Sequence, residues 1–191
     1  GLVVAGIGDK GKSTYKRSRI GNAEIDKVVE HVLKCSDEPF EIVDFTPYGY
    51  DERQYCSPGF NLPIGCLQRT PHGQYPEYHT SADNFDFVRP EYMADSFSKY
   101  LSVFSILENN KRFYNTNPRC EPQLGKRGLY TAIGGESNTI VDQMALLWVL
   151  NLSDGQHTLM DISERSGMKF DLIKNAADAL LQKGLLQECI G

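Results

Sequence analysis

The sequence predicts an α/β domain followed by a small winged helix-turn-helix domain. Its first part alternates short apolar runs, rich in β-branched residues, with amphipathic helical patterns, the order expected for part of a sheet sandwiched by helices. The end of the chain instead carries closely spaced helical patterns with short turns. A segment rich in Asn, Pro, Gly and Arg separates the two. We therefore divide the chain into an α/β part (residues 1–108), a connector (109–138) and a winged helix-turn-helix domain (139–191).

The strands of the α/β part are predicted from continuous apolar runs that end at Gly, Pro or Asp. Its helices are predicted from apolar residues that recur every three or four positions. In the later helix this stripe consists of Met93, Phe97, Tyr100, Leu101 and Phe104, and we expect it to face the core. Strands are expected over residues 2–7, 40–45 and 62–68, and helices over residues 23–34 and 92–107.

The winged helix-turn-helix domain is predicted from three helical segments and a final strand. The first helix is expected over residues 140–150 and is followed by a turn at Asp154 and Gly155. Thr158 is expected to cap the second helix, because Asp161 three positions later completes a pattern close to a capping box. The third helix is expected over residues 170–183, and LLQECI after Gly184 reads as the first strand of a wing.

Composition bears on whether the protein spans a membrane, where in the cell it resides and whether it attracts nucleic acid. The longest apolar run has seven residues, whereas roughly 20 are needed to span a bilayer, so no membrane segment is expected. The five cysteines are scattered and form no C-x-x-C pair, which favours reduced thiols and a cytoplasmic location. A net charge of −5 provides no general attraction to nucleic acid. The chain opens on Gly inside a strand-like run, so we expect it to be a fragment of a longer protein.

The opening stretch GLVVAGIGDKGKST raises a competing hypothesis. Residues 6–13 fit the spacing G-x-x-x-x-G-K-S of phosphate-binding loops. In such a loop the Lys-Ser pair opens a helix whose N-terminal amides hold the phosphates. Residues 15–21 have few apolar positions, and Gly21 ends them, so no helix is predicted there. A P-loop nucleotide-binding protein is therefore the weaker hypothesis, with Asp44 as its candidate metal-binding carboxylate.

The loop region of residues 48–84 holds most of the candidate site residues. It concentrates charged and aromatic residues after strand ends, where α/β proteins build their sites. His79 lies there between an aromatic residue and small polar ones, so its imidazole is a candidate metal ligand or base. Taken alone, the same position also fits a structural or exposed histidine.

Four stretches give the chain a family resemblance: GDKGKSTYKRSRIGNAEID, GYDERQYCSPGFNLPIG, YPEYHTSADN and the helical tail. With them the chain resembles the second half of zinc-dependent aminopeptidases of the di-zinc exopeptidase class. It most closely resembles bacterial aminopeptidase-like proteins that carry a C-terminal winged helix and are often labelled as polysaccharide biosynthesis proteins. The resemblance covers essentially the whole chain and implies the C-terminal part of a zinc-exopeptidase-like helix–sheet–helix sandwich.

The resemblance implies that Asp9, after the first strand, and His79 bind zinc, with one or two ions in the intact protein. A catalytic zinc takes at least three protein ligands and a water, and the other ligands and the general base of the family lie upstream. We therefore expect this chain to be an inactive fragment of a metal-dependent hydrolase for a peptide-like or amino-acyl substrate. The alternative is a non-catalytic peptidase-like scaffold that acts through its winged helix.

Five further residues are assigned around this site. The resemblance implies that Asp51 supports the site without binding metal. Arg53 and Arg69 carry guanidinium groups suited to a substrate carboxylate. The phenols of Tyr55 and Tyr78 are candidates for shaping the pocket or for donating to a tetrahedral intermediate. For each of the five, a structural or solvated role is the competing interpretation.

The charge of the tail decides what we expect it to bind. Residues 137–191 contain seven acidic and four basic side chains, which gives a net charge of −3. Neutralising phosphates supplies most non-specific DNA affinity, and this surface offers few cations for it. We therefore expect the winged helix to contact protein, in a partner or in a second copy of the chain, rather than DNA.

Overall fold

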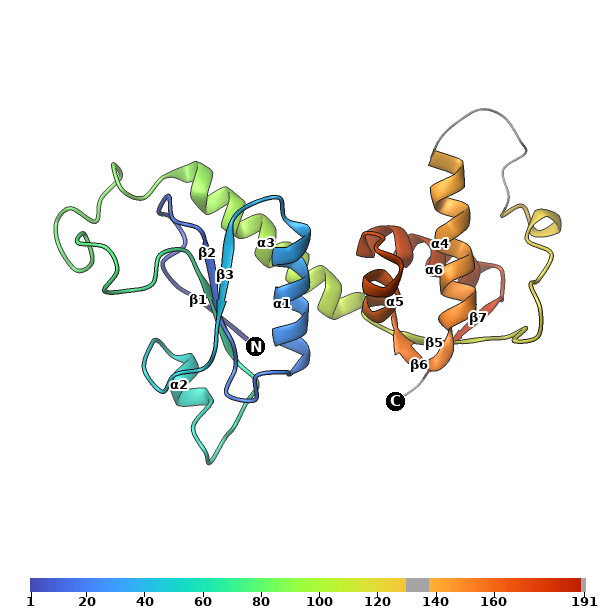
Figure 1. Ribbon diagram of the computed structural model, residues 1–191, viewed down its shortest axis with the longest axis horizontal. Coiled ribbons are helices and arrows are strands. Elements are labelled where there is room, and N and C mark those ends of the chain that lie inside the picture. Colours follow the sequence, from blue (N-terminus) through green and yellow to red (C-terminus); the bar gives the residue numbers. More distant parts are fainter. Residues whose placement is uncertain (130–137, 190–191) are drawn as a thin grey trace. The chain divides into compact units, whose positions relative to one another are not determined.

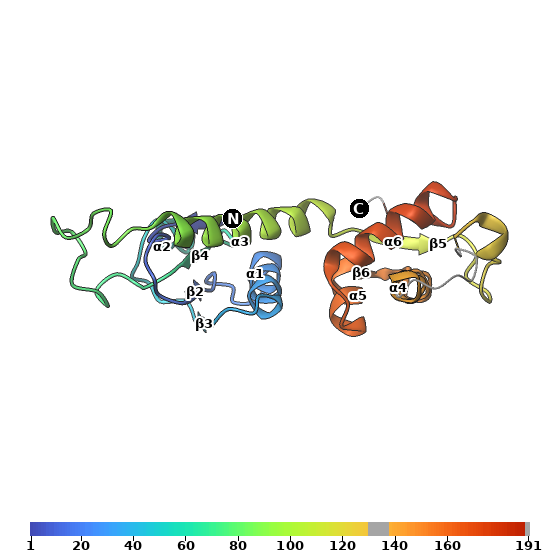
Figure 2. The same ribbon diagram turned by 90° about the horizontal axis from the view of Figure 1, so that it is seen from above.

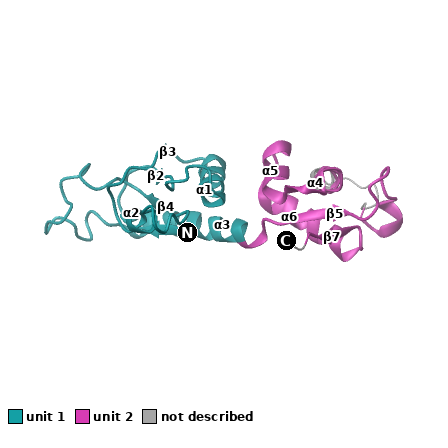
Figure 3. Ribbon diagram, turned by 90° about the horizontal axis from the view of Figure 1, so that it is seen from below, with its two compact units in different colours: residues 1–107 teal, residues 108–191 magenta. Residues whose placement is uncertain are grey.

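The computed structural model describes residues 1–129 and 138–189, and for residues 138–142 it describes the backbone alone. The chain divides into two compact units, Gly1–Leu107 and Glu108–Gly191 (Figure 3). Residues 130–137 of the predicted connector and Ile190 of the predicted wing strand lie outside the described residues. The mixed α/β architecture and the winged helix-turn-helix end are as the sequence predicts.

Unit 1, on the left of Figure 1, is built on a four-stranded mixed sheet. The strand order is β1-β4-β2-β3. Strand β1 runs parallel to β4, β2 runs parallel to β3, and β2 and β4 are antiparallel. The carboxyl end of β1 therefore lies beside that of β4, which places the loops after these two strands together. The elements of unit 1 are β1 (Leu2–Val4), β2 (Ser13–Lys16), α1 (Glu24–Cys35), β3 (Phe40–Val43), α2 (Glu52–Tyr55), β4 (Gly65–Gln68) and α3 (Pro90–Asn109).

The sequence pattern missed the short helix α2 and, in the sheet of unit 1, strand β2. The sequence of β2 is STYK, and all four side chains are buried. The hydroxyl of Tyr15 donates to Asp26 on α1 at 2.8 Å, and the ammonium of Lys16 pairs with Glu52 on α2. Because each long polar side chain finds a buried partner, a strand without an apolar run is stable in the centre of the sheet.

The core of unit 1 forms where α1 packs against the sheet. Val28, Val29 and Leu33 of α1 are fully buried, as the apolar face predicted for this helix requires. The ring of Tyr15 crosses β4 at Gly65, where an added Cβ would lie 2.1 Å from the Tyr15 hydroxyl oxygen. Only glycine fits beneath this ring, so the close approach of β2 and β4 depends on Gly65.

The face that α3 turns to the core differs from the predicted one. Ser96, Tyr100, Val103 and Ile106 are buried, and the Tyr100 hydroxyl donates to the carbonyl of Leu67 in β4. Tyr100 thus faces the core as expected, whereas the other four residues of the predicted stripe are exposed: Met93, Phe97, Leu101 and Phe104. Because α3 has apolar residues on two faces, its periodicity is compatible with either orientation, and packing against the sheet selects one.

Unit 2 is a helical bundle backed by a small antiparallel sheet of order β6-β5-β7. The predicted capping box is present: Thr158 Oγ1 accepts from the Asp161 amide at 3.1 Å, and the Thr158 amide donates to the Asp161 carboxylate at 2.8 Å. Strand β5 lies within the segment predicted as a connector, and it forms the centre of this sheet. The elements are β5 (Arg112–Asn115), η1 (Gly125–Arg127), α4 (Asn138–Leu152), β6 (Asp154–Thr158), α5 (Leu159–Ser166), α6 (Phe170–Gln182) and β7 (Leu186–Glu188).

Candidate functional site

A pocket of about 790 Å³ opens beside Asp9 in unit 1. Its floor comes from the loop after β1 and from Thr70 just beyond β4, and its walls come from the loop region before α3 and from the start of α3. The pocket therefore lies at the joint carboxyl ends of β1 and β4, the position where α/β sheets commonly bind ligands.

Asp9 is held rigidly at the floor of this pocket. Its residue surface is 4% exposed. Oδ1 accepts hydrogen bonds from the Gly11 amide at 2.7 Å and from the Thr70 hydroxyl at 2.5 Å. Oδ2 accepts one longer bond, at 3.2 Å, from the Thr70 amide. The carboxylate is thus oriented by both loops, and Oδ2 accepts one hydrogen bond where Oδ1 accepts two, which leaves Oδ2 with acceptor capacity.

The same contacts explain the glycine that suggested a phosphate-binding loop. The Gly11 amide is already engaged with Asp9, and an added Cβ on Gly11 would lie 2.1 Å from the Thr70 hydroxyl oxygen. Ser13 begins strand β2 rather than a helix, and Lys12 pairs with Glu41 at 2.9 Å. A phosphate-binding loop requires free amides at a helix N-terminus. The P-loop hypothesis is therefore wrong in its structural premise.

His79 lies within the loop that forms the pocket wall. Glu77 and Ala82, on either side of it in the chain, line the pocket, whereas His79 itself does not. Its ring is exposed and stacks on Tyr78, with 4.0 Å between ring centroids. Its φ is +58°, a left-handed conformation that is uncommon outside glycine and that Asn, Asp and His adopt more often than other residues do.

An aromatic cluster supports this loop. Tyr75 stacks on Phe87 with ring centroids 5.2 Å apart, and both residues line the pocket. Tyr78 meets Tyr75 edge to face and lies 6.1 Å from the ring of His72. Burial, assisted by the negative charge of Asp83, raises the pKa of the Tyr75 phenol, so its hydroxyl stays protonated and can donate a hydrogen bond. Of the two tyrosines predicted to shape the pocket, Tyr78 thus lies in the cluster that supports its wall.

The other predicted site residues are divided between α2 and the end of β4. Asp51 precedes α2 without a side-chain cap, and Arg53 and Tyr55 are exposed on the same short helix. None of these three lines the pocket beside Asp9. Arg69 is buried instead: it donates to the Gly11 carbonyl at 2.7 Å and to Asp95 at 2.7 Å. Arg69 therefore braces the loop that carries Asp9.

Two residues that sequence reasoning did not assign support the site region. Thr70 orients Asp9 through both its amide and its hydroxyl, and no sequence pattern marks it. Glu52 is fully buried, accepts from the Tyr50 amide at 3.2 Å and pairs with Lys16. The adjacent acidic residues Asp51 and Glu52 were the available signal, but sequence does not determine which of two neighbours points inward.

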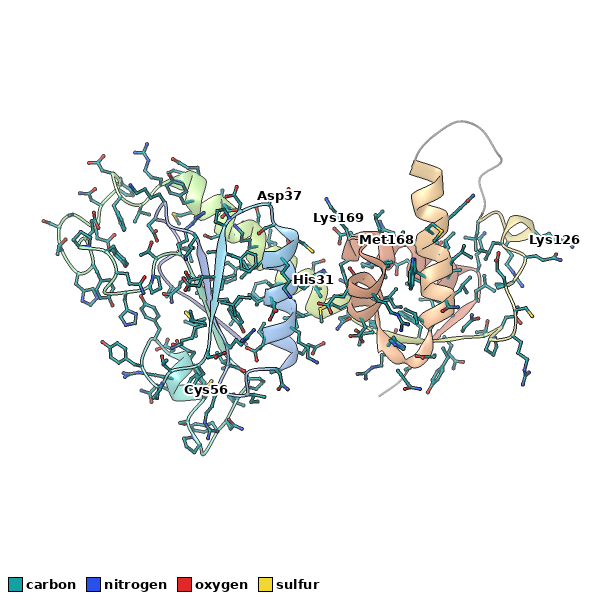
Figure 4. The ribbon with its side chains drawn as sticks, in the orientation of Figure 1. His31, Asp37, Cys56, Lys126, Met168 and Lys169 are labelled. Carbon is teal, nitrogen blue, oxygen red and sulfur yellow. The ribbon has the colours of Figure 1, made fainter. Side chains whose placement is uncertain are left out.

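The buried thiols near α2 have structural environments. Cys56, labelled in Figure 4, donates to the carbonyls of Leu62 and Ile64 at 3.3 and 3.2 Å and so ties the loop after α2. Burial, with a smaller contribution from the charge of Glu52, raises the pKa of Cys66 to about 12. Because thiolate is the metal-binding form of cysteine, Cys66 is unsuited to bind a metal here.

The donor groups within this chain fit part of a metal site. Asp9 offers a buried, oriented carboxylate with spare acceptor capacity, and carboxylate is a suitable zinc ligand. Within residues 1–129 and 138–189, however, no three His, Cys, Asp or Glu side chains gather as a metal-binding group. A catalytic zinc needs at least three protein ligands, so further ligands have to come from outside this set.

Comparison with known proteins places the chain in a family. Residues 1–110 match the model of a domain of unknown function, DUF4910. The chain belongs to the DUF4910 family. Beyond the DUF4910 domain, residues 111–188 match a winged helix-turn-helix model, which agrees with unit 2.

A curated relative and a solved structure, both from Clostridium acetobutylicum, extend the comparison. A curated relative, provisionally named as a polysaccharide biosynthesis protein with an aminopeptidase-like domain, is 51% identical over 187 residues, which are 98% of this chain and 43% of the relative. A crystal structure provisionally described as a peptidase shares 47% identity with a TM-score of 0.88 and covers 99% of this chain and 42% of its own. This chain of the DUF4910 family thus spans less than half the length of either protein.

These comparisons confirm the aminopeptidase-like resemblance at the level of names and fold. They leave zinc, catalysis and the substrate as predictions. In the part of the chain that the structure describes, the helices are all too short or too polar to cross a membrane.

Proposed function

We propose that the DUF4910 domain contributes half of the active site of a zinc-dependent, aminopeptidase-like hydrolase. The observation that carries the proposal is the oriented Asp9 carboxylate at the floor of the pocket, where β1 and β4 end. The peptidase and aminopeptidase-like names of the two relatives support the same class. The association of one relative with polysaccharide biosynthesis suggests that the substrate carries an amino-acyl or amino-sugar group.

In this proposal each residue has a limited role. Asp9 and His79 are the protein ligands from this chain, and the remaining ligands and the general base come from the rest of the longer protein. Bound zinc would lower the pKa of a water and polarise a carbonyl. Thr70 and Gly11 hold the Asp9 carboxylate in place, which reduces the reorganisation needed when a cation binds.

The charge of the pocket favours a substrate with a free amine. Acidic residues outnumber basic ones among the side chains that line it. A protonated amino group gains Coulomb energy from the excess of negative charge in such a pocket. The acidic lining residues are Asp9, Glu77, Asp86 and Glu91, and the basic ones are Lys10 and Arg89.

Zinc binding by the full-length gene product tests this function. We expect the purified protein to contain zinc, and we expect Asp9→Asn and His79→Ala to weaken zinc affinity at least about tenfold in competition with a chelator. Asp37→Asn is the matched control, because Asp37 is exposed and lies outside the pocket lining. Full zinc affinity in Asp9→Asn would rule out the proposed ligand. A folded full-length protein without zinc would favour the non-catalytic scaffold.

We further propose that the winged helix binds protein rather than DNA. On α6, Lys174 pairs with Asp178 at 2.7 Å, and Asp171 adds an exposed negative charge. The helix that would enter the DNA groove therefore has little positive charge to neutralise phosphates. In gel shifts with duplex DNA at low salt we expect no binding up to about 10 μM protein, because non-specific binders typically reach dissociation constants near this range. Tight, salt-sensitive binding would contradict this assignment.

A further inference from the structure

The outer face of α3 carries a continuous row of large apolar side chains. Met93, Phe97, Leu101 and Phe104 are 44%, 59%, 51% and 48% exposed. Their spacing of three or four residues places them on one face of the helix, and the opposite face packs on the sheet. Figure 2 shows α3 as the long helix that lies over the strands of unit 1. Single exposed apolar residues are ordinary on a protein surface, but a contiguous row indicates an interaction site.

The residues around this row carry almost no charge. Between residues 97 and 107 the one charged residue is Lys99, which is buried and pairs with Asp95 at 2.5 Å. Ser98 and Ser102 are exposed, yet their hydroxyls donate back to the carbonyls four residues earlier, both at 3.0 Å. A solvated helix face normally carries charged side chains. On the outer face of α3, by contrast, the Ser98 and Ser102 hydroxyls bond to the helix backbone, and the larger exposed side chains are apolar, as in a protein interface.

The neighbouring edge of the sheet has the same character. Strand β1 is an edge strand of the described sheet, with β4 on one side, and Val4 is 54% exposed. Its sequence LVV has none of the charged or proline residues that commonly protect a free edge. The row on α3 begins beside the loop that follows this strand, because a Cβ added to Gly8 would lie 3.3 Å from Met93. We call the four α3 side chains and the free edge of β1 the α3–β1 surface.

The length of the relatives indicates what covers this surface. The match spans 43% of the curated relative and 42% of the solved structure, so more than half of each protein lies outside it. We propose that the α3–β1 surface is the interface with the remainder of a longer polypeptide. That remainder adds a strand to β1 and lays apolar side chains over α3. This assignment is independent of zinc, since it concerns the packing of the domain and not its ligands.

Site-specific photocross-linking in the full-length gene product tests the interface. A benzoylphenylalanine in place of Phe97 is expected to cross-link within one molecule to residues outside the 191 residues of this chain. The same probe in place of Phe60, which is 72% exposed on another loop of unit 1, is the control and is expected to give a much lower yield of such products. A cross-link from position 97 to a second copy or to residues 108–191 would overturn the proposal. So would the absence of any cross-link.

A stability measurement on the same protein provides a second, independent test. The double variant Phe97→Ser/Leu101→Ser is expected to lower the Tm of the full-length protein by at least about 5 °C, as loss of buried apolar contacts does. In the 191-residue chain, where both side chains are about half exposed, it is expected to change the Tm by less than about 2 °C. Phe60→Ser is the control for a surface change. Equal shifts in the two lengths of protein would overturn the proposal.

Discussion

Replacing Asp26 with Ala is expected to lower the free energy of unfolding of unit 1 by about 3 kcal/mol or more. Asp26 is 1% exposed. Its carboxylate accepts from the Tyr15 hydroxyl at 2.8 Å, the Ser18 amide at 2.7 Å, the Ser18 hydroxyl at 2.6 Å and the Ala23 amide at 2.9 Å. Removing it leaves these donors unpaired in the interior, and each buried unpaired donor carries a desolvation cost.

Hydrogen exchange of the α1 amides in urea measures this loss, because it reports the unfolding of unit 1 locally. Asp26→Asn keeps the shape and one acceptor oxygen, so we expect it to lose part of the stability. Asp37, labelled in Figure 4, is exposed after α1, and Asp37→Ala is expected to change the free energy by less than about 0.5 kcal/mol. A loss below about 1 kcal/mol for Asp26→Ala would contradict the role assigned to this carboxylate.

Replacing Lys16 with Met is expected to destabilise unit 1 by about 3–5 kcal/mol. The side chains of Lys16 and Glu52 are 8% and 0% exposed. The ammonium of Lys16 also donates to the Tyr48 carbonyl at 2.8 Å. Without it, the Glu52 carboxylate is left as an uncompensated charge in the interior, and Glu52 Oε2 already has no hydrogen-bond partner among the described residues.

The double variant Lys16→Met/Glu52→Gln distinguishes the charge from the packing. It removes both charges, so we expect it to recover most of the stability lost in the single variant. Both variants are measured by urea unfolding at pH 7. Lys12→Met is the matched control, because Lys12 pairs with Glu41 on the surface, where both side chains are about half exposed, and such pairs contribute at most about 1 kcal/mol. A double variant no more stable than the single one would show that packing, and not charge, is the cause.

The sequence predicted most elements whose apolar pattern has one consistent reading. The helix expected over residues 23–34 is α1, Glu24–Cys35, and the helix expected over residues 170–183 is α6, Phe170–Gln182. The capping pattern at Thr158 correctly marked the start of α5. Strand β2 was missed because its stability comes from the specific polar partners of Tyr15 and Lys16, which hydrophobic patterning does not reveal.

In the candidate site, too, some features could be predicted from local sequence and others depend on long-range contacts. The place of Asp9 after a strand could be read from the sequence, because an apolar run that ends at Gly and Asp predicts where a sheet edge lies. The contacts of Asp9 with Thr70 could not be predicted from the sequence, because they join residues 61 positions apart. His79 was recognised through a family resemblance, and its chemistry as a ligand stays a prediction.

Local sequence patterns alone determined the order of most helices and strands and the winged helix-turn-helix end. They also determined where Asp9 and His79 lie in the chain relative to the predicted strands. Local patterns suffice for this because periodicity and capping act over a few residues. Only the tertiary structure decided that Glu52 rather than Asp51 points inward. It also decided that the stripe holding Phe97 faces outward. Both outcomes depend on which partner lies across the fold, and a residue's neighbours in the chain do not specify that partner.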